Sequence, residues 1–387
     1  MNFKKKILIC ITARPSYSRI KSTALALNKR DEIDLVVLAS GSALLERYGR
    51  VVDQIKDDGL TVVEELYTFV EGNDPINMAL TTASTLSASA MSMARIAPDL
   101  VVTIADRYET LGTAIAASYS GIPLIHIQGG EITGNIDERV RHAVTKLSDM
   151  HLVANHVAGD RIRSMGEDPS TIFVTGCPSI DIAVQSRSLD FEIVKDSVTQ
   201  LGVGQNIDLD KPYCVILQHP ETEQHTDSYN CMMQTLCAVK EASLASLIFW
   251  PNVDAGSDAT SKALRVSREQ GVLKTSRLIK NLEGEIFLRL LSKAECLIGN
   301  SSVGIRECSF LGVPVVNIGC RQDGRTRGHN VLDSQWNQEE ITAAILKQIY
   351  HGKYESDTIY GDGKSGETIA KLLASELNFG PKRFVDP

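Results

Sequence analysis

Acidic residues follow two neighbouring apolar runs in the first half of the chain. Asp106 comes directly after the run Leu100–Ala105, and Glu131 follows the run Pro123–Ile127 across a Gln-Gly-Gly turn, with Asp137 close behind. Carboxyl groups that lie close together raise one another's pKa towards neutrality, where such a group can both remove and deliver protons. The spacing of these three residues therefore indicates acid–base chemistry.

Residues suited to an anion follow apolar runs in the second half. Ser301 and Ser302 come after the run Cys296–Gly299 and open a helix-like stretch, whose first backbone N–H groups can hold a phosphate. Glu307 lies one turn inside that predicted helix, where it can reach a ribose diol. Arg321 follows the next apolar run, and a guanidinium group is a strong phosphate ligand. The set indicates a phosphorylated ligand.

Two further polar residues end apolar runs, and each has an ordinary structural explanation as well as a functional one. Arg14 can bind an anion, or it can simply belong to a Pro-containing turn with a Ser helix cap. His219 is followed by a proline that fixes the turn, although a single His is more often structural. Asp106 can likewise cap the helix that follows it. Glu138 and Arg141 are expected to be solvated charges on a helix face, paired at short spacing.

The elements that must position these residues alternate along the whole chain. The predicted strands are Lys6–Thr12, Asp34–Ala39, Leu100–Ala105, Pro123–Ile127, His151–Ala154, Thr171–Thr175, Tyr213–Gln218, Ser246–Trp250, Cys296–Gly299 and Pro314–Ile318. The predicted helices include Tyr17–Asn28, Pro75–Ala94, Glu109–Ser120, Val157–Met165 and Gly366–Leu377. Apolar strands separated by helices are typical of a doubly wound parallel sheet, and ligands bind such sheets outside the carboxyl ends of the strands.

The pattern loosens around 186–211, which we interpret as a linker, and a second set of strands and helices follows. We therefore predict an α/β protein with two Rossmann-like domains that face a central cleft. The predicted domains are 1–190 and 208–365, and residues 366–387 form a C-terminal helix and tail.

The composition excludes several classes of protein. The net charge of −8 argues against a nucleic-acid partner, and the eight cysteines contain no CxxC pair that would indicate a zinc site or a disulfide scaffold. The uncharged window Ile76–Ala94 is rich in Ser and Thr, which predicts a buried or half-buried helix and no membrane association. The strings around Gly363 and Gly202 lack glycines that an ATPase or a nicotinamide dehydrogenase needs. We expect a reduced, cytoplasmic protein.

Nine strings, in order from about residue 6 to 365, carry a resemblance to a known family. They are ARPSYS, DRYET, HIQGGEITGNIDE, RHAVTKLS, GCPSID, LQHPET, FWPNVDAGS, IGNSSVGIRE and GCRQDGR. Together they closely resemble the hydrolysing UDP-N-acetylglucosamine 2-epimerases of sialic-acid pathways. The resemblance implies a fold like that of type B glycosyltransferases, a UDP-sugar substrate, release of UDP, no cofactor or metal, and a homodimer or homotetramer.

The resemblance also implies roles for residues that match the motifs. The implied ligands of UDP and substrate are Arg14, Ser18, Arg107, Gln128, Asn252, Asp254, Ser301, Ser302, Glu307 and Arg321. The implied catalytic residues are Asp106, Glu131, Asp137 and His219, of which His219 also matches a UDP ligand. Position 128 is often Glu in the family but is Gln here, so we expect Glu131 to carry the acid–base role instead.

The implied reaction fits this set of residues. The C2 hydrogen of the sugar is a poor acid, so its removal must accompany departure of UDP from C1, and inversion at C2 then needs proton transfer on both faces. A rival substrate is UDP-N,N′-diacetylbacillosamine, the precursor of legionaminic acid. The sequence also leaves open a non-hydrolysing epimerase, a retaining glycosyltransferase of the same fold and a catalytically silent sugar-nucleotide sensor.

Overall fold

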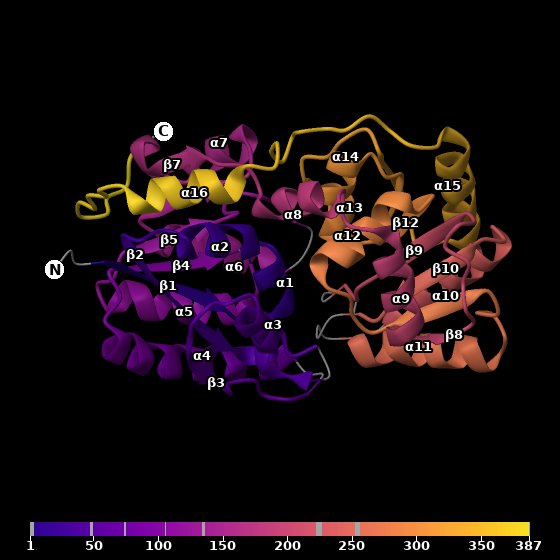
Figure 1. Cartoon of the computed structure of the whole chain (residues 1–387), viewed down its shortest axis with the longest axis horizontal. Helices are drawn as coiled ribbons and strands as arrows, with labels where there is room; N and C mark the ends of the chain where they lie inside the picture. The colour runs from indigo at the N-terminus through magenta and orange to yellow at the C-terminus, as the bar shows by residue number, and fades with distance from the viewer. Residues whose placement is uncertain are drawn as a thin grey trace. The chain divides into compact units, whose positions relative to one another are not determined.

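The computed structural model describes residues 4–46, 49–72, 75–104, 106–133, 136–221, 227–251 and 256–386. It divides into two compact units, the first made of residues 1–132, 136–181 and 360–387 and the second of residues 133–135 and 182–359 (Figure 1). Each unit is a mainly parallel sheet covered by helices, so the predicted α/β class with two Rossmann-like domains is confirmed.

The sheet of the first unit has the strand order of a Rossmann fold. In the described residues the order is β3-β2-β1-β4-β5-β6-β7, and every neighbouring pair is parallel. The strands are β1 (Lys5–Ile11), β2 (Ile33–Ser40), β3 (Val62–Leu66), β4 (Leu100–Ile104), β5 (Leu124–Ile127), β6 (Met150–Val153) and β7 (Ile172–Val174). The strand order reverses between β1 and β4, which is where ligands bind in this architecture.

Helices cover both faces of the first sheet, and β1 shows why. Its residues Ile7 and Ile9 belong to one apolar core and Leu8 and Cys10 to another, so alternate side chains face opposite layers. The helices of the unit are α1 (Arg14–Ser18), α2 (Lys21–Asn28), α3 (Val51–Asp57), α4 (Pro75–Ile96), α5 (Tyr108–Tyr119), α6 (Asp137–Leu147), α7 (His156–Ser164) and α16 (Ser365–Ala374), with 3-10 turns at Gly41–Leu44 and Pro169–Thr171.

The second unit repeats the same order around its own sheet. The order is β14-β13-β12-β9-β10-β11-β8, parallel except for the edge strand β8. The strands are β8 (Gly202–Gly204), β9 (Tyr213–Leu217), β10 (Ala245–Phe249), β11 (Ser276–Ile279), β12 (Cys296–Gly299), β13 (Val315–Ile318) and β14 (Val331–Ser334). The helices are α9 (Phe191–Leu201), α10 (Ser228–Glu241), α11 (Ser257–Glu269), α12 (Gly284–Lys293), α13 (Ser302–Ile305), α14 (Glu307–Leu311) and α15 (Gln338–His351). The order reverses between β9 and β12.

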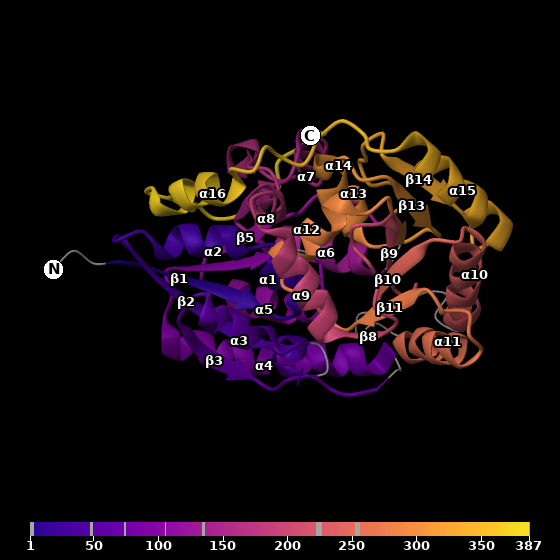
Figure 2. The ribbon, with the colours of Figure 1, turned by 45° about the vertical axis from the view of Figure 1, so that its right-hand side comes forward.

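Helix α16 returns to the first unit after the chain has completed the second. It packs on α2, as Figures 1 and 2 show, and its residues Ile369, Ala370 and Leu373 are fully buried in the core that contains Ile7. Helix α8 (Pro178–Ser186) carries the outgoing chain across the boundary at residues 181 and 182. The second unit is thus inserted into the sequence of the first.

The structure differs from the sequence prediction in several elements. The segment 186–211, expected as a linker, contains helix α9 and strand β8. Helix α9 buries Val194 and Val198, four residues apart, but its other residues are mostly polar. The predicted helix Tyr17–Asn28 is divided between α1 and α2. Among the described residues, no helix is long and apolar enough to cross a membrane.

Candidate functional site

In the first unit, the acidic residues singled out from the sequence lie beyond the carboxyl ends of β4 and β5. Asp106 is buried, and two guanidinium groups contact its carboxylate: Arg141 Nη2 forms a short ion pair with Oδ2, and Arg19 Nη1 lies 3.6 Å from Oδ1. Glu131 is also buried. Asp137 is half-buried in the first turn of α6, where a carboxylate is stabilised by the helix dipole.

Arg141 joins two of these positions. Its Nη2 binds Asp106, and its Nη1 donates to the backbone carbonyl of Glu131 at 2.8 Å. From the sequence, Arg141 is expected to be a solvated charge on the helix surface. That expectation is wrong, because the Arg141 side chain is fully buried, as are Val140 and Val144 of the same helix. Arg141 therefore fixes Asp106 against the loop that carries Glu131.

The Gln-Gly-Gly turn after β5 is tightly constrained. Gln128 has a left-handed backbone with φ +65°, which is strained for a residue other than glycine. Gly130 has φ +74°, and a Cβ there would lie 2.3 Å from the carbonyl oxygen of Ala158. The Gln128 side chain is buried and donates through Nε2 to Cys177 Sγ at 2.8 Å, while its Oε1 has no hydrogen-bond partner in the described part of the chain. The turn thus brings the backbone close to α7.

The remaining first-unit residues predicted to bind substrate have these positions. Arg14 begins α1 and is half-buried, and Ser18 ends the same helix, exposed, with its hydroxyl donating to Pro15 O at 3.1 Å. Arg107 is buried, and its Nε lies 3.3 Å from Glu109 Oε2. These contacts place Arg14 beyond β1 and Arg107 beyond β4, at the two strands between which the order reverses.

In the second unit, His219 and Asn300 lock together the ends of β9 and β12. The His219 backbone N–H donates to Asn300 Oδ1 at 2.8 Å, and Asn300 Nδ2 donates to the His219 carbonyl at 2.9 Å. Both residues are buried. The two hydrogen bonds fix the backbone that carries Ser301 and the His219 side chain. This backbone lies where the strand order reverses, which is where ligands bind in such sheets.

The polar turn after β12 is a real helix start, but the helix is short. Ser301 is the N-cap of α13 and accepts from the Val303 N–H at 3.4 Å, and Ser302 is the first helical residue. Helix α13 ends at Ile305, so Glu307 begins the separate helix α14 and does not lie inside the same helix. Its side chain is nearly buried, and its Oε2 has no hydrogen-bond partner in the part of the chain that the structure describes.

Arg321 lies in a turn after β13 that is held by two neighbours. Its Nη1 donates to Asn300 O at 3.3 Å, and the Gln322 side chain donates to the same carbonyl at 2.8 Å. The backbone N–H of Arg321 donates to Glu221 at 3.2 Å. A small pocket near this turn is lined by Gln218, His219, Pro220, Glu221, Ser228, Cys231, Thr260 and Trp336. Asn252 and Asp254, also predicted to bind UDP, lie outside the described residues.

Three residues of the site were missed by the sequence analysis: Arg141, Asn300 and Glu221. Asn300 and Glu221 each stand within two residues of a predicted site residue, Ser301 and His219, so the motifs contained them. The signal for Arg141 is its place between apolar residues at helical spacing, which predicts a buried position. All three act through hydrogen bonds to other parts of the site and not through a distinctive motif of their own.

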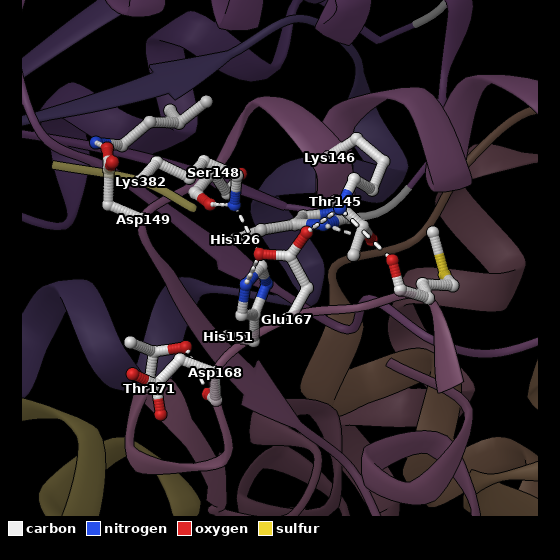
Figure 3. Close-up of polar contacts among 12 residues, drawn as sticks. His126, Thr145, Lys146, Ser148, Asp149, His151, Glu167, Asp168, Thr171 and Lys382 are labelled. Carbon is white, nitrogen blue, oxygen red and sulfur yellow. Dashed lines mark hydrogen bonds and ion pairs between the residues drawn. The ribbon is translucent and has the colours of Figure 1, made fainter. Parts of the chain in front are cut away.

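A second polar cluster in the first unit surrounds Glu167, which is almost fully buried after α7 (Figure 3). His151 Nε2 lies 3.1 Å from Glu167 Oε2, and Lys146 and Lys382 form short ion pairs with the same carboxylate. Burial alone would raise the pKa of Glu167, but the hydrogen bonds from His151, Lys146 and Lys382 lower it to about 2. Burial lowers the pKa of His151, so that its ring stays neutral at physiological pH. The cluster attaches the C-terminal tail to α6 and β6.

Comparison with known proteins identifies relatives over almost the whole chain. The family model for UDP-N-acetylglucosamine 2-epimerase matches residues 25–374. A hydrolysing UDP-N,N′-diacetylbacillosamine 2-epimerase from Legionella pneumophila is 30% identical over 370 residues, which is 95% of this chain and 95% of that protein. A UDP-N-acetylglucosamine 2-epimerase from Neisseria meningitidis is 27% identical over 388 residues, covering 98% of this chain and 99% of that one.

Two solved structures share the fold. The N. meningitidis epimerase bound to UDP-N-acetylglucosamine superimposes with a TM-score of 0.78 at 20% identity, covering 95% of this chain and 99% of that chain. The Methanocaldococcus jannaschii epimerase in complex with UDP-N-acetylglucosamine and UDP gives a TM-score of 0.79 at 18% identity, again covering 95% and 99%. At this identity the likeness shows the architecture alone.

Proposed function

The chain belongs to the UDP-N-acetylglucosamine 2-epimerase family, and we propose that it is a hydrolysing member, which converts UDP-N-acetylglucosamine and water into N-acetylmannosamine and UDP. The first unit supplies the groups that act on the sugar, and the second unit supplies the groups that bind UDP. We propose that the enzyme works in the cytoplasm, as its composition indicates, and that it forms a homodimer or homotetramer, as the family resemblance implies.

The observation that carries this proposal is the buried group formed by Asp106, Arg141 and the Glu131 loop. Two guanidinium groups contact the Asp106 carboxylate and hold it in one position, as a group that transfers a proton to or from a fixed carbon requires. Arg141 also donates to the backbone carbonyl of Glu131. The same guanidinium group therefore links Asp106 to the loop that carries the second buried carboxyl group, that of Glu131. Inversion at a carbon atom needs one group on each face, and this arrangement provides two carboxyl groups with fixed backbones.

The second unit provides groups for the leaving diphosphate. A phosphate leaving group is stabilised by positive charge and N–H donors, and it does not require a proton. Arg321 supplies the charge, the Ser301–Ser302 turn supplies donors, and Glu307 is the acceptor for the ribose hydroxyls. His219 stands beside them, with its backbone fixed by Asn300.

The proposed reaction proceeds in two balanced steps. A carboxylate removes the C2 proton, a double bond forms between C1 and C2, and the bond from C1 to the UDP oxygen breaks with its electron pair leaving on UDP. Water then adds its oxygen at C1, and a proton is delivered to C2 on the opposite face. The released sugar is N-acetylmannosamine, and the second proton of the water remains with the active-site groups and solvent.

A second candidate substrate is UDP-N,N′-diacetylbacillosamine. The observation in its favour is the L. pneumophila relative with that specificity, which is 30% identical over 95% of this chain. The reacting C1 and C2 positions and the diphosphate are the same in the two substrates. They differ in the substituents at C4 and C6 of the sugar, so they must be distinguished by the ratio of kcat/KM for the two compounds.

The test is to incubate the purified protein with UDP-N-acetylglucosamine in D₂O and follow the C1 and C2 protons by NMR. We expect free UDP and N-acetylmannosamine with deuterium at C2, because a carboxyl group exchanges its proton with solvent. Release of N-acetylglucosamine with its original C2 hydrogen would refute the epimerase proposal. UDP-N-acetylmannosamine as the product would show a non-hydrolysing enzyme. The same assay with UDP-N,N′-diacetylbacillosamine decides between the two candidate substrates.

A further inference from the structure

We propose that Glu221 is a positioning residue for the nucleotide diphosphate, because its buried carboxylate fixes the turn that carries Arg321. This inference rests on the proposed function in one respect, namely that Arg321 binds the diphosphate. Glu221 itself is not expected to touch the nucleotide. It acts through the backbone of the loop that follows β13. In the sheet of the second unit, β12 lies between β13 and β9, the strand that precedes Glu221.

Within the described residues, the side-chain hydrogen bonds of Glu221 are all directed to one turn. Its Oε1 accepts the backbone N–H of Cys320 at 2.8 Å and that of Arg321 at 3.2 Å. Its Oε2 lies 3.3 Å from Cys320 Sγ, from which the thiol donates. Burial and, to a smaller extent, the hydrogen bond to Glu221 raise the pKa of Cys320 to about 11. The thiol therefore stays protonated and remains a donor. The described structure gives this carboxylate no bond to any other residue.

The backbone of the turn is shaped to receive this carboxylate. Gly319, which follows β13, has φ +78°, a conformation that favours glycine. A Cβ at Gly319 would lie 2.3 Å from Glu221 Oε1 and 2.7 Å from the Trp336 ring. The chain therefore turns closely around the carboxylate, which is only 7% exposed.

Two successive backbone N–H groups in such a turn form a concavity that would otherwise suit an external anion. In this protein Glu221 occupies it from inside the fold. The diphosphate must therefore be bound by the Arg321 side chain and not by the backbone of its turn. Since the guanidinium group also donates to Asn300 O, its position is set from both sides, by Glu221 at the backbone and by Asn300 at the side chain.

The loss of Glu221 leaves two N–H groups in a half-buried turn without an acceptor, and the turn must rearrange to expose them. A guanidinium group contributes most when it is held in place before the ligand arrives. We therefore expect E221A to weaken UDP binding roughly tenfold, while uridine, which has no phosphate, binds as it does to the wild-type protein. E221Q keeps an acceptor oxygen in the same place, so its UDP affinity is expected to stay within about threefold of wild type.

A double-mutant cycle tests whether Glu221 acts through Arg321. UDP and uridine affinities are measured by NMR titration for the wild-type protein, E221A, R321A and the double variant. If Glu221 only positions Arg321, E221A has no further effect on UDP affinity once Arg321 is absent. Additive effects of the two substitutions would overturn the inference. If E221A does not fold, E221D makes the same comparison, because its shorter side chain cannot reach both N–H groups.

D181A is the matched control. Asp181 is buried and likewise accepts two successive backbone N–H groups, those of Ser365 and Gly366, but in the first unit. Its substitution is expected to lower stability without changing the ratio of UDP to uridine affinity. An equal change of that ratio in D181A and E221A would show a general structural effect and refute the inference.

Amide hydrogen exchange of residues 319–322 gives a readout that does not need the nucleotide. Exchange of Cys320 and Arg321 should be faster in E221A and close to wild type in E221Q, and unchanged exchange in E221A would overturn the inference. If the wild-type protein binds no UDP, the proposed function fails and this inference fails with it. If the wild-type protein binds UDP and E221A binds it equally well, only this inference fails.

Discussion

Replacement of Glu167 by Gln tests the reasoning about the buried cluster in the first unit. The carboxylate has an ordinary pKa of 4.5, and its contacts with His151, Lys146 and Lys382 outweigh the effect of burial and lower it to about 2. A tenfold change in proton affinity is worth about 1.4 kcal/mol, so the ionised group stabilises the folded unit by about 3 kcal/mol at neutral pH. E167Q cannot ionise, and we expect it to lose that amount.

The pH dependence has a defined sign. Because the pKa is lower in the folded protein, the stabilisation is complete above pH 4.5 and is lost as the pH falls from 4.5 towards 2. The difference in the free energy of unfolding between wild type and E167Q should therefore be about 3 kcal/mol at pH 7 and should shrink steadily through that range. A difference that is the same at pH 7 and pH 3 would refute the reasoning.

The assay must report the first unit, because a protein with two units need not unfold in a single step. Native-state hydrogen exchange of the β6 amides does so. Trp250 and Trp336 are the two tryptophans of the chain and lie in the second unit, so their fluorescence provides an internal reference that E167Q should not change. E367Q is the control variant. Its ion pair with Arg30 is exposed, and its loss should cost less than about 1 kcal/mol at either pH.

Three further predictions concern the site. D106N should lower kcat at least about 100-fold while UDP affinity stays unchanged, because Asp106 is proposed to act on the sugar; normal turnover by NMR assay would reduce it to a structural residue. R321A should weaken UDP binding by about 1.5–3 kcal/mol, the usual contribution of a hydrogen bond to a charged group, and calorimetry that shows unchanged affinity would place the diphosphate elsewhere. G130A should destabilise the protein by at least about 2 kcal/mol in thermal denaturation, because its Cβ would meet the Ala158 carbonyl. The control G121A has φ +68° but no atom within 4 Å of the added Cβ, so it should cost about 1 kcal/mol. Equal losses of stability in the two variants would contradict the steric argument.

The central strands could be predicted from sequence because they are buried on both faces. The runs that become β1, β4 and β12 are almost entirely apolar, and their predicted ends differ from the observed ones by at most a residue. Four strands were missed, namely β3, β8, β11 and β14, and all have weaker signals. β8 is only the three residues Gly202–Gly204, and β11 is short and contains Arg277. β3 contains Glu64 and Glu65 and is partly exposed, and β14 contains Asp333. Both pair with one neighbour only, so their sequences need not be apolar.

The positions of the site residues could be predicted only as far as they follow a strand. Asp106, His219 and Ser301 each lie just beyond a strand end, and parallel strands bring such ends to one edge of a sheet. The contacts that fix them could not be predicted. Arg141 is distant in sequence from Asp106, so the apolar residues near it in α6 can indicate that it is buried but not which carboxylate it binds.

The return of α16 to the first unit has a consequence for synthesis on the ribosome. The core of the first unit includes Ile369 and Leu373, which are translated only after the whole of the second unit. The second unit is contained within residues 133–135 and 182–359, so it can complete its own sheet while the first unit still lacks a helix. Although N-terminal domains usually fold first during translation, here the later-made unit can finish before the earlier one. A ribosome-bound chain that ends before Ser365 would therefore carry an exposed apolar surface on α2, the surface that a chaperone would recognise.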